Sequence, residues 1–265
     1  MMKACRTGLL NPAFDLLVTT LLWLYFTLGF VILFLPFYLA AYLFSRQREI
    51  AFQRLNHLFY RGFLRLLRVL SPGVVWRVSP EIKSIRSSVV VSNHLSYLDP
   101  LILISLFPCH KTIVKSVFFS APIFGWMMKQ SGFIPDSARG RLAELMIERV
   151  EAMDGYLARG GNLFVFPEGT RSRSGEIGPF NTGAFKLARR CKAPIEVLRI
   201  SGTDKVFFPG RFLFNALAPA AITVERVAVI DPDDRNQGLS VAEMMERARD
   251  LLEQHVTLNG PPKGP

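Results

Sequence analysis

The sequence of 265 residues is poor in cysteine and has fewer acidic than basic residues. Its three cysteines, Cys5, Cys109 and Cys191, stand far apart, which excludes a disulfide scaffold and a zinc finger. It has 21 Asp and Glu against 32 Lys and Arg, a formal net charge of +11. Half of the residues are hydrophobic and 12% are aromatic, which excludes a largely disordered chain. This combination is typical of a protein that works at an anionic membrane or on a large anionic substrate.

Charged side chains are absent from residues 16–45, a stretch of thirty residues. A transmembrane helix needs only about 20 apolar residues, so this run is long enough to cross a bilayer. A secretory signal has an apolar core of only about 7–15 residues, and we therefore expect the segment to stay attached. Pro36 is expected to kink or break the helix. Two geometries remain open: residues 16–35 span the bilayer, or the whole run bends and re-enters one leaflet.

Arginines are concentrated directly after this run. By the positive-inside tendency, the bulk of the chain is expected to face the cytoplasm, on an inner (cytoplasmic) membrane. The spacing of four of them places them on one helical face, which predicts an amphipathic helix held at the interface by anionic lipid head groups. An ordinary domain helix with a solvated basic face remains the alternative. These four arginines are Arg54, Arg61, Arg65 and Arg68.

The tripeptide Ser71-Pro72-Gly73 predicts a boundary between membrane-anchoring helices in residues 1–72 and a second domain in residues 73–265. Short β-branched runs then alternate with helical stretches, which predicts an α/β fold: a layered αβα domain with a mostly parallel central sheet. A helix is predicted over 139–159, ending at two glycines, a last helix closes at 250–255, and a frayed tail follows from residue 259. The predicted strands are 74–78, 89–92, 112–114, 162–166, 195–200 and 222–230.

A first polar cluster follows the buried-looking strand at 89–92. His94 and Asp99 lie five residues apart, and a carboxylate on one imidazole nitrogen leaves the other nitrogen as a base that can activate a hydroxyl. A purely structural hydrogen bond between His94 and Asp99 that caps the helix starting near Asp99 is the alternative. Ser96 would be a third candidate, as a nucleophile, but the sequence has no Gly-x-Ser-x-Gly elbow. A metal site that adds Cys109 and His110 lacks recognisable ligand spacing.

A second polar cluster follows the predicted strand at 162–166. Gly169 allows close backbone approach, Arg171 and Arg173 offer forked donors to a phosphate, Thr170 adds a hydroxyl, and Glu168 offers a carboxylate to a polyol. A surface turn that happens to contain two arginines is the alternative. The stretch 178–186 is not a P-loop, because its lysine does not directly follow the second glycine. Nucleotide hydrolysis therefore loses its main support.

The two clusters in this order resemble the glycerolipid acyltransferase family, which includes 1-acyl-glycerol-3-phosphate acyltransferases. The first is an HX4D motif, Asn93-His94-Leu-Ser-Tyr-Leu-Asp99, and the second is Phe166-Pro-Glu168-Gly-Thr-Arg171-Ser172. Lys115, Pro122-Ile-Phe-Gly125 and Gly132-Phe-Ile134 lie between them, and Pro194-Ile195 and Ile200-Ser-Gly-Thr203 follow. The resemblance covers roughly residues 75–230, and the N-terminal hydrophobic helices also look like those with which bacterial members dock on the membrane.

The resemblance implies an O-acyltransferase in phospholipid biosynthesis. His94 would be the general base and Asp99 would orient it, while the acceptor hydroxyl attacks an acyl thioester directly. Acyl-CoA or acyl-carrier protein would be the co-substrate, with no metal and no cofactor. The acceptor is expected to be a lysophospholipid, most of all 1-acyl-sn-glycerol 3-phosphate, which would become phosphatidic acid. The residues implied in binding it are Glu168, Gly169, Thr170, Arg171, Lys115 and Ser96.

The sequence departs from the family pattern after Ile134. The family usually places an arginine within two residues, whereas this chain has Pro135-Asp136, with Arg139 displaced, and the second proline usual after Pro194 is also absent. These departures leave room for another lysolipid acceptor, such as the lyso-aminolipid lyso-ornithine lipid. A non-catalytic membrane protein that only binds anionic lipid, and a lipid hydrolase, remain as other classes. Nucleic-acid binding is disfavoured, because the arginines cluster beside an apolar run that such a protein does not need.

Overall fold

The computed structural model describes residues 7–136, 140–232 and 238–259, so Cys5, Arg139 and the tail 260–265 lie outside the described residues. The chain forms two compact units. The first comprises Met1–Val78, Leu95–Pro108 and Ile200–Thr223, and the second comprises Ser79–His94, Cys109–Arg199 and Val224–Pro265. The first unit thus takes in more of the chain than the anchor predicted at 1–72.

A seven-stranded sheet has the order β1-β7-β6-β2-β5-β3-β4. The pairs β2–β5, β2–β6, β3–β5 and β3–β4 are all parallel, which confirms the predicted α/β fold with a mostly parallel sheet. Every residue of β2 and β5 is buried, as continuous apolar runs in central parallel strands require. The strands are β1 (Val74–Val78), β2 (Val89–Ser92), β3 (His110–Val114), β4 (Ile134–Pro135), β5 (Asn162–Val165), β6 (Ile195–Ser201) and β7 (Ala220–Ile230).

The predicted strands coincide with six of these, within about two residues at their ends. The strand β4 was not predicted, because it has two residues, one of them a proline, and so carries no periodic pattern. The helix predicted at 139–159 is found as two short helices, α6 (Arg141–Glu151) and α7 (Met153–Ala158). It ends as predicted, because Gly160 takes a φ of +89° that favours glycine.

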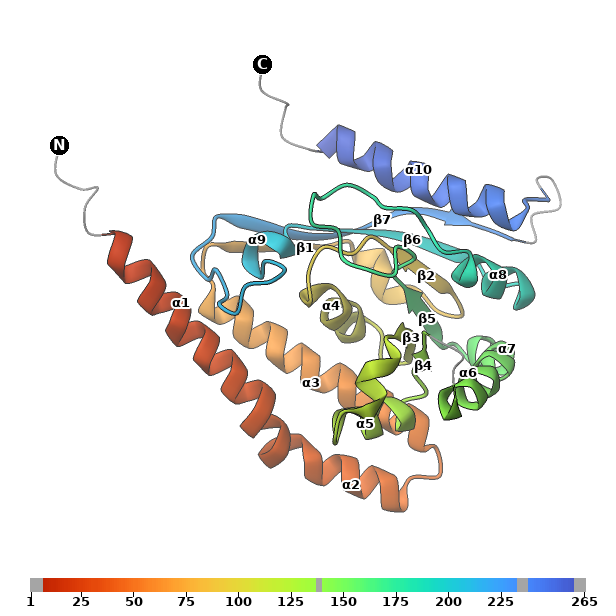
Figure 1. Cartoon of the computed structure of the whole chain (residues 1–265), viewed down its shortest axis with the longest axis horizontal. Helices are drawn as coiled ribbons and strands as arrows, with labels where there is room; N and C mark the ends of the chain where they lie inside the picture. Colours follow the sequence, from red (N-terminus) through yellow and green to blue (C-terminus); the bar gives the residue numbers. More distant parts are fainter. Residues whose placement is uncertain (1–6, 137–139, 233–237, 260–265) are drawn as a thin grey trace. The chain divides into compact units, whose positions relative to one another are not determined.

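The helices of the second unit pack along its strands (Figure 1). The long C-terminal helix α10 (Val241–Asn259) packs on α8 (Gly183–Arg190), and α8 contacts β2. The pair α6 and α7 packs beside β4 and β5. The short elements η2 (Pro80–Ser84), η3 (Ser116–Ser120) and α5 (Phe124–Gln130) complete this unit.

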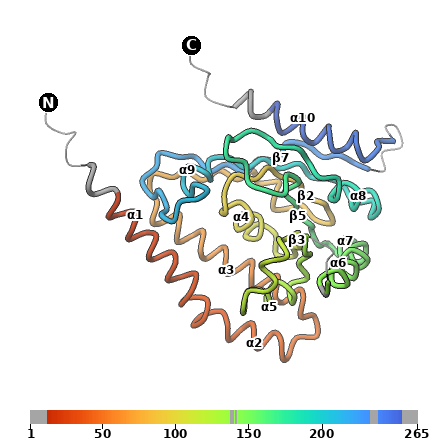
Figure 2. Tube along the Cα trace, viewed as in Figure 1, coloured from red at the N-terminus to blue at the C-terminus, as the bar shows by residue number. Residues whose placement is uncertain are grey.

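The apolar N-terminal run is one continuous helical segment, here called the rod, which bends at the start of α2 (Figure 2). It consists of α1 (Thr7–Leu24), a π-helical segment η1 (Tyr25–Phe34) and α2 (Leu35–Phe44). Of the kink or break expected at Pro36, the kink is found: the rod continues, but it bends at the start of α2, and Pro36 lies in the first turn of α2 directly after the π-helical turns. The hydroxyls of Thr20 and Thr27 donate to carbonyls four residues earlier, so neither needs water.

The next helix, α3 (Arg48–Leu70), turns back and packs against the rod and against α4 (Leu98–Leu106). Tyr25 fixes this contact, because its hydroxyl donates to the carbonyl of Phe59 at 2.9 Å and a side chain at Gly62 would overlap it. The apolar face of α3 is thus covered by protein, whereas its four aligned arginines are exposed. This arrangement matches the domain-helix alternative for the apolar face and leaves the basic face open.

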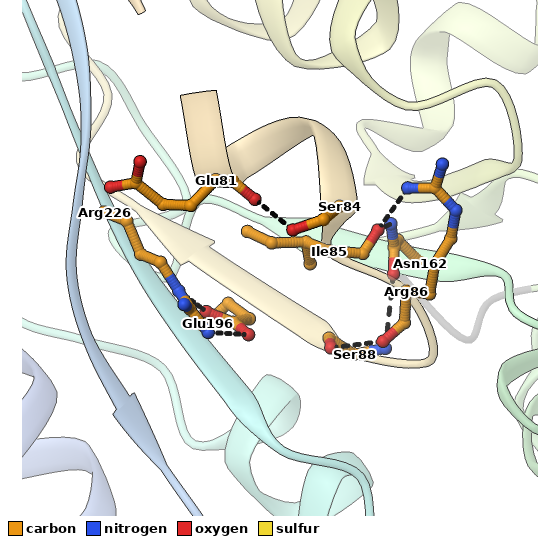
Figure 3. Close-up of polar contacts among 8 residues, drawn as sticks. All are labelled: Glu81, Ser84, Ile85, Arg86, Ser88, Asn162, Glu196 and Arg226. Atoms are coloured by element: carbon orange, nitrogen blue, oxygen red, sulfur yellow. Dashed lines mark hydrogen bonds and ion pairs between the residues drawn. The ribbon is translucent and has the colours of Figure 1, made fainter. Parts of the chain in front are cut away.

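Polar side chains tie the strands of the second unit together (Figure 3). Asn162, 1% exposed at the start of β5, accepts the N–H of Ser88 at 3.2 Å and donates to the carbonyl of Ile85 at 2.8 Å. Arg226 on β7 makes two hydrogen bonds to buried Glu196 on β6, at 2.6 and 2.7 Å, and these bonds raise the pKa of Arg226. Glu196, which follows Pro194-Ile195, therefore links β6 to β7.

Replacing Asn162 should destabilise the fold. Asn162→Ala leaves the Ser88 N–H and the Ile85 carbonyl buried without that partner, so we expect the free energy of unfolding to fall by about 1–3 kcal/mol. The measurement is urea denaturation in detergent, followed by circular dichroism. Arg249→Ala is the control, since it removes only an exposed ion pair with Glu253 and should cost about 0.5 kcal/mol or less. Equal losses in the two variants would contradict this role of Asn162.

Candidate active site

The two polar clusters follow neighbouring parallel strands. Val91 of β2 pairs with Val165 of β5, so the chain leaves both strands at the same edge of the sheet. There the N–H of Ser172 donates to the carbonyl of His94 at 2.8 Å, which joins the second cluster to the first. Each cluster was predicted to follow a strand, and both lie outside the carboxyl ends of these strands, where ligands bind in open α/β sheets.

His94 is held from several sides within the second unit. Its N–H donates to Oε1 of Glu168 at 3.0 Å, and its imidazole stacks on the ring of Phe166, with centroids 4.2 Å apart and planes at 19°. The side chain is half-buried. Backbone and ring are therefore both fixed, which is what a group that exchanges a proton with a bound substrate requires.

The turn after His94 is organised by Asp99, which is 0% exposed. Its Oδ2 accepts the N–H of Leu95 at 2.6 Å and of Ser96 at 2.7 Å, and its Oδ1 accepts the hydroxyl of Thr203 at 2.6 Å. Asp99 lies in the first turn of α4 and reaches back to two earlier N–H groups, as the carboxylate of a capping box does. One of these N–H groups, that of Leu95, belongs to the peptide directly after His94.

Glu168 holds the backbone on both sides of the second cluster. It is 9% exposed, and its two carboxylate oxygens accept the N–H groups of His94 and Gly178, each at 3.0 Å. Both oxygens thus hold backbone. Glu168 therefore positions the backbone of His94 and the loop at Gly178, and its role in binding an acceptor polyol stays a prediction.

The second cluster itself is a tight turn. The N–H of Gly169 donates to the carbonyl of Phe166 at 3.0 Å, and the φ of +67° at Gly169 favours glycine. Thr170 and Gly169 are exposed, and Arg171 is half-buried. The residues predicted to bind a phosphate thus lie at or near the surface of the second unit. The residue that follows them, Ser172, is hydrogen-bonded to the backbone of His94.

Ser96 is buried, and its hydroxyl is engaged by the protein. It is 0% exposed, and its hydroxyl donates to the carbonyl of Phe207 at 2.7 Å. The same oxygen accepts the N–H of Leu98 at 3.3 Å. The Ser96 hydroxyl thus links the start of α4 to Phe207, and the geometry gives no support to a serine nucleophile.

Lys115 is exposed and directly follows β3, which lies next to β5. The following residue, Ser116, donates its N–H and its hydroxyl to Oδ1 of Asp136, both at 2.8 Å. Asp136 is the residue found where the family usually has an arginine, so a carboxylate here holds the turn beside Lys115.

The metal-site alternative finds no geometry in its favour. His110 is 0% exposed and lies among the rings of Phe133 and Phe164. Within residues 7–136, 140–232 and 238–259, no group of three or more His, Cys, Asp or Glu side chains is placed to hold a metal ion.

Two residues of this region were missed by the reasoning from sequence. Phe166 was predicted only as part of the second motif, and its ring is the one on which His94 stacks. Thr203 was quoted only as part of the Ser-Gly-Thr stretch, and it contacts a residue 104 positions earlier, which no local pattern reveals.

Comparison with known proteins agrees with these motifs. A family model described as Acyltransferase matches residues 77–201. The 1-acyl-sn-glycerol-3-phosphate acyltransferase of Saccharomyces cerevisiae is 30% identical over 72% of this chain and 63% of that protein. A chloroplastic 1-acyl-sn-glycerol-3-phosphate acyltransferase of Brassica napus is 35% identical over 46% of this chain and 35% of that protein. The chain therefore spans from about one third to under two thirds of the length of these relatives.

A crystal structure of the 1-acyl-sn-glycerophosphate acyltransferase PlsC from Thermotoga maritima has a similar fold, with a TM-score of 0.71 over 96% of this chain and 100% of that one. The two sequences are 20% identical, so this likeness concerns the fold. The family model covers the segment that holds both polar clusters, so residues 77–201 are similar to the Acyltransferase family in the same part of the chain that carries the two motifs.

Proposed function

We propose that the protein transfers a fatty acyl chain from an acyl thioester to the free hydroxyl of a lysophospholipid. The observation that carries the proposal is that His94 is fixed in two ways. Its backbone N–H donates to Glu168 and its imidazole stacks on Phe166, and the turn proposed to bind phosphate begins directly after Phe166. Support also comes from the family match over residues 77–201 and from relatives named 1-acyl-sn-glycerol-3-phosphate acyltransferase.

The chemistry requires one base and no covalent enzyme intermediate. His94 takes the proton of the acceptor hydroxyl, and the oxygen attacks the carbonyl carbon of the thioester. Collapse of the tetrahedral intermediate breaks the C–S bond, and the departing thiolate receives the proton from His94. Asp99 orients the imidazole and stabilises its protonated form, as the resemblance implies. Acyl-CoA or acyl-carrier protein supplies the thioester.

The acceptor is 1-acyl-sn-glycerol 3-phosphate, and its phosphate binds at the turn after β5. Arg171 offers a forked pair of donors, Thr170 a hydroxyl and Gly169 an open backbone, while Lys115 adds a positive charge from the end of β3. This assignment gives the basic side chains near the sheet edge a common task.

A lyso-aminolipid is the second candidate acceptor, and Asp136 is the observation that favours it. A carboxylate stands where the family usually has an arginine, beside the exposed Lys115, and it would attract rather than repel a cationic head group. A panel of lysolipids with both kinds of thioester donor separates these two acceptors.

The rod is proposed to lie in one leaflet of an inner (cytoplasmic) membrane rather than to span it. One face of the rod packs on α3, and its other face exposes many large apolar side chains. Spanning would carry the exposed arginines of α3 through the hydrocarbon, at a cost of about 2.5–3.5 kcal/mol each near its centre. In an interfacial position the apolar face enters the lipid, and the arginines meet anionic head groups.

Loss of the base should abolish most of the transfer. For His94→Ala we expect the rate of acyl transfer from a labelled thioester to fall by about 10²–10⁴, the usual contribution of a general base. The assay uses native membranes and measures transfer to a lysolipid as well as release of free fatty acid. A near wild-type rate in His94→Ala would refute the base assignment. Fatty acid release without any acceptor would instead indicate a hydrolase.

The phosphate contact predicts an effect on one substrate only. Arg171→Ala should raise the KM for 1-acyl-sn-glycerol 3-phosphate by about 10- to 100-fold, the range for a hydrogen bond to a charged group, and leave the KM of the thioester unchanged. Arg190→Ala, which removes an exposed arginine at the end of α8, is the control. An equal rise of KM with monoacylglycerol, which has no phosphate, would argue against this contact.

The basic face of α3 predicts salt-dependent membrane binding. Replacing its four arginines by glutamine should weaken binding to vesicles that contain anionic lipid, by up to about 1 kcal/mol for each charge, and the difference should shrink as salt is added. The control removes four exposed arginines of the second unit, Arg189, Arg190, Arg247 and Arg249, and so changes the net charge equally. Equal weakening in both variants would mean that net charge alone drives binding. The variant replaces Arg54, Arg61, Arg65 and Arg68.

A further inference from the structure

The stretch Ser201-Gly202-Thr203, at the end of β6 and the start of α9 (Thr203–Val206), has no task in the mechanism above. We propose that Thr203 is a positioning residue for acyl transfer, which acts through Asp99 on the turn that carries His94. The inference rests on the proposed function, because it concerns the rate of that reaction.

The contact is short and shielded from water. The Oγ1 of Thr203 donates to Oδ1 of Asp99 at 2.6 Å, and both residues are 0% exposed. A buried carboxylate needs donors from the protein, since it has lost those of water. Its other oxygen, Oδ2, is taken by the N–H groups of Leu95 and Ser96. Thr203 therefore supplies the side-chain donor seen on Oδ1, and it comes from a distant part of the chain.

The backbone before Thr203 is built to place this hydroxyl. Gly202 has a φ of +78°, and a side chain there would overlap the carbonyl oxygen of Ala221 on β7, so only glycine fits. Ser201 shares a hydrogen bond with the hydroxyl of Thr223, also on β7. The turn is thus fixed on both sides of the glycine, and Thr203 has little freedom to move away from Asp99.

The hydroxyl has a specific mechanical consequence for the turn. With Oδ1 fixed by Thr203, the carboxylate plane of Asp99 is fixed, and Oδ2 stays on the N–H of Leu95, which belongs to the peptide bond that begins at His94. Without that donor the carboxylate loses one of the contacts that set its plane, so the peptide that begins at His94 is held less firmly. Small displacements of a catalytic base lower the rate of the chemical step more than they lower binding.

The test compares Thr203→Val, which has the same shape but no hydroxyl, with Thr203→Ser, which keeps the hydroxyl. We expect Thr203→Val to lower kcat by roughly 10- to 100-fold, with the KM of both substrates within about twofold of wild type. Thr203→Ser should restore kcat to within about threefold. Ser201→Ala, which removes the neighbouring hydroxyl, is the matched control and should keep kcat within about twofold.

The variants are compared as full-length protein in the same membranes or detergent, after circular dichroism has shown that each is folded. Should Thr203→Val not fold, Thr203→Ala removes the same hydroxyl without adding a methyl group in its place. A kcat within about threefold of wild type in the folded variant without the hydroxyl overturns the inference, and so does a loss in Thr203→Ser as large as in Thr203→Val. His94→Ala in the same assay separates a failure of the proposed function from a failure of the inference about Thr203. If His94→Ala remains active, the proposed function fails, whatever the Thr203 variants do.

Discussion

The chain that leaves β2 has three consecutive N–H groups to satisfy, and the structure satisfies them with two carboxylates. Glu168 accepts the N–H of His94, and Asp99 accepts those of Leu95 and Ser96. A buried strand that ends in irregular backbone must find such acceptors, because unpaired N–H groups away from water cost about as much as a lost hydrogen bond. The motif residues are thus first of all the solution to a folding problem, and this solution leaves the imidazole of His94 at the carboxyl edge of a rigid sheet.

Much of the fold and the main polar residues could be predicted because their signals are local. The β-branched runs gave six strands, and two polar turns placed directly after strands indicated one edge of a parallel sheet. What could not be predicted depends on distant partners: Glu168 and Thr203 reach their targets 74 and 104 residues away, and β4 is too short for a pattern. A side chain such as Glu168 has the same chemistry whether it faces substrate or backbone, so only the fold decides its task.

The N-terminal rod shows the same division between composition and packing. Its lack of charge correctly indicated a helix long enough to cross a membrane. Composition could not reveal that α3 folds back on it, with Tyr25 against Gly62 and the hydroxyl of Tyr38 on Asn56. Nor could it reveal that π-helical turns come directly before the helical turn that contains Pro36. These contacts make the rod part of the first unit. One of its apolar faces packs on α3, and the other exposes its side chains.

The engagement of Ser96 bears on how an acyl group would move. A serine nucleophile has to present its oxygen to the thioester and its proton to a base. Here the oxygen is buried, its proton is donated to the Phe207 carbonyl, and it accepts the N–H of Leu98. Releasing it would leave the Phe207 carbonyl and the Leu98 N–H without this partner in a buried place, which costs free energy. Direct attack by the acceptor hydroxyl, which is the route proposed above, leaves both of these contacts of Ser96 in place.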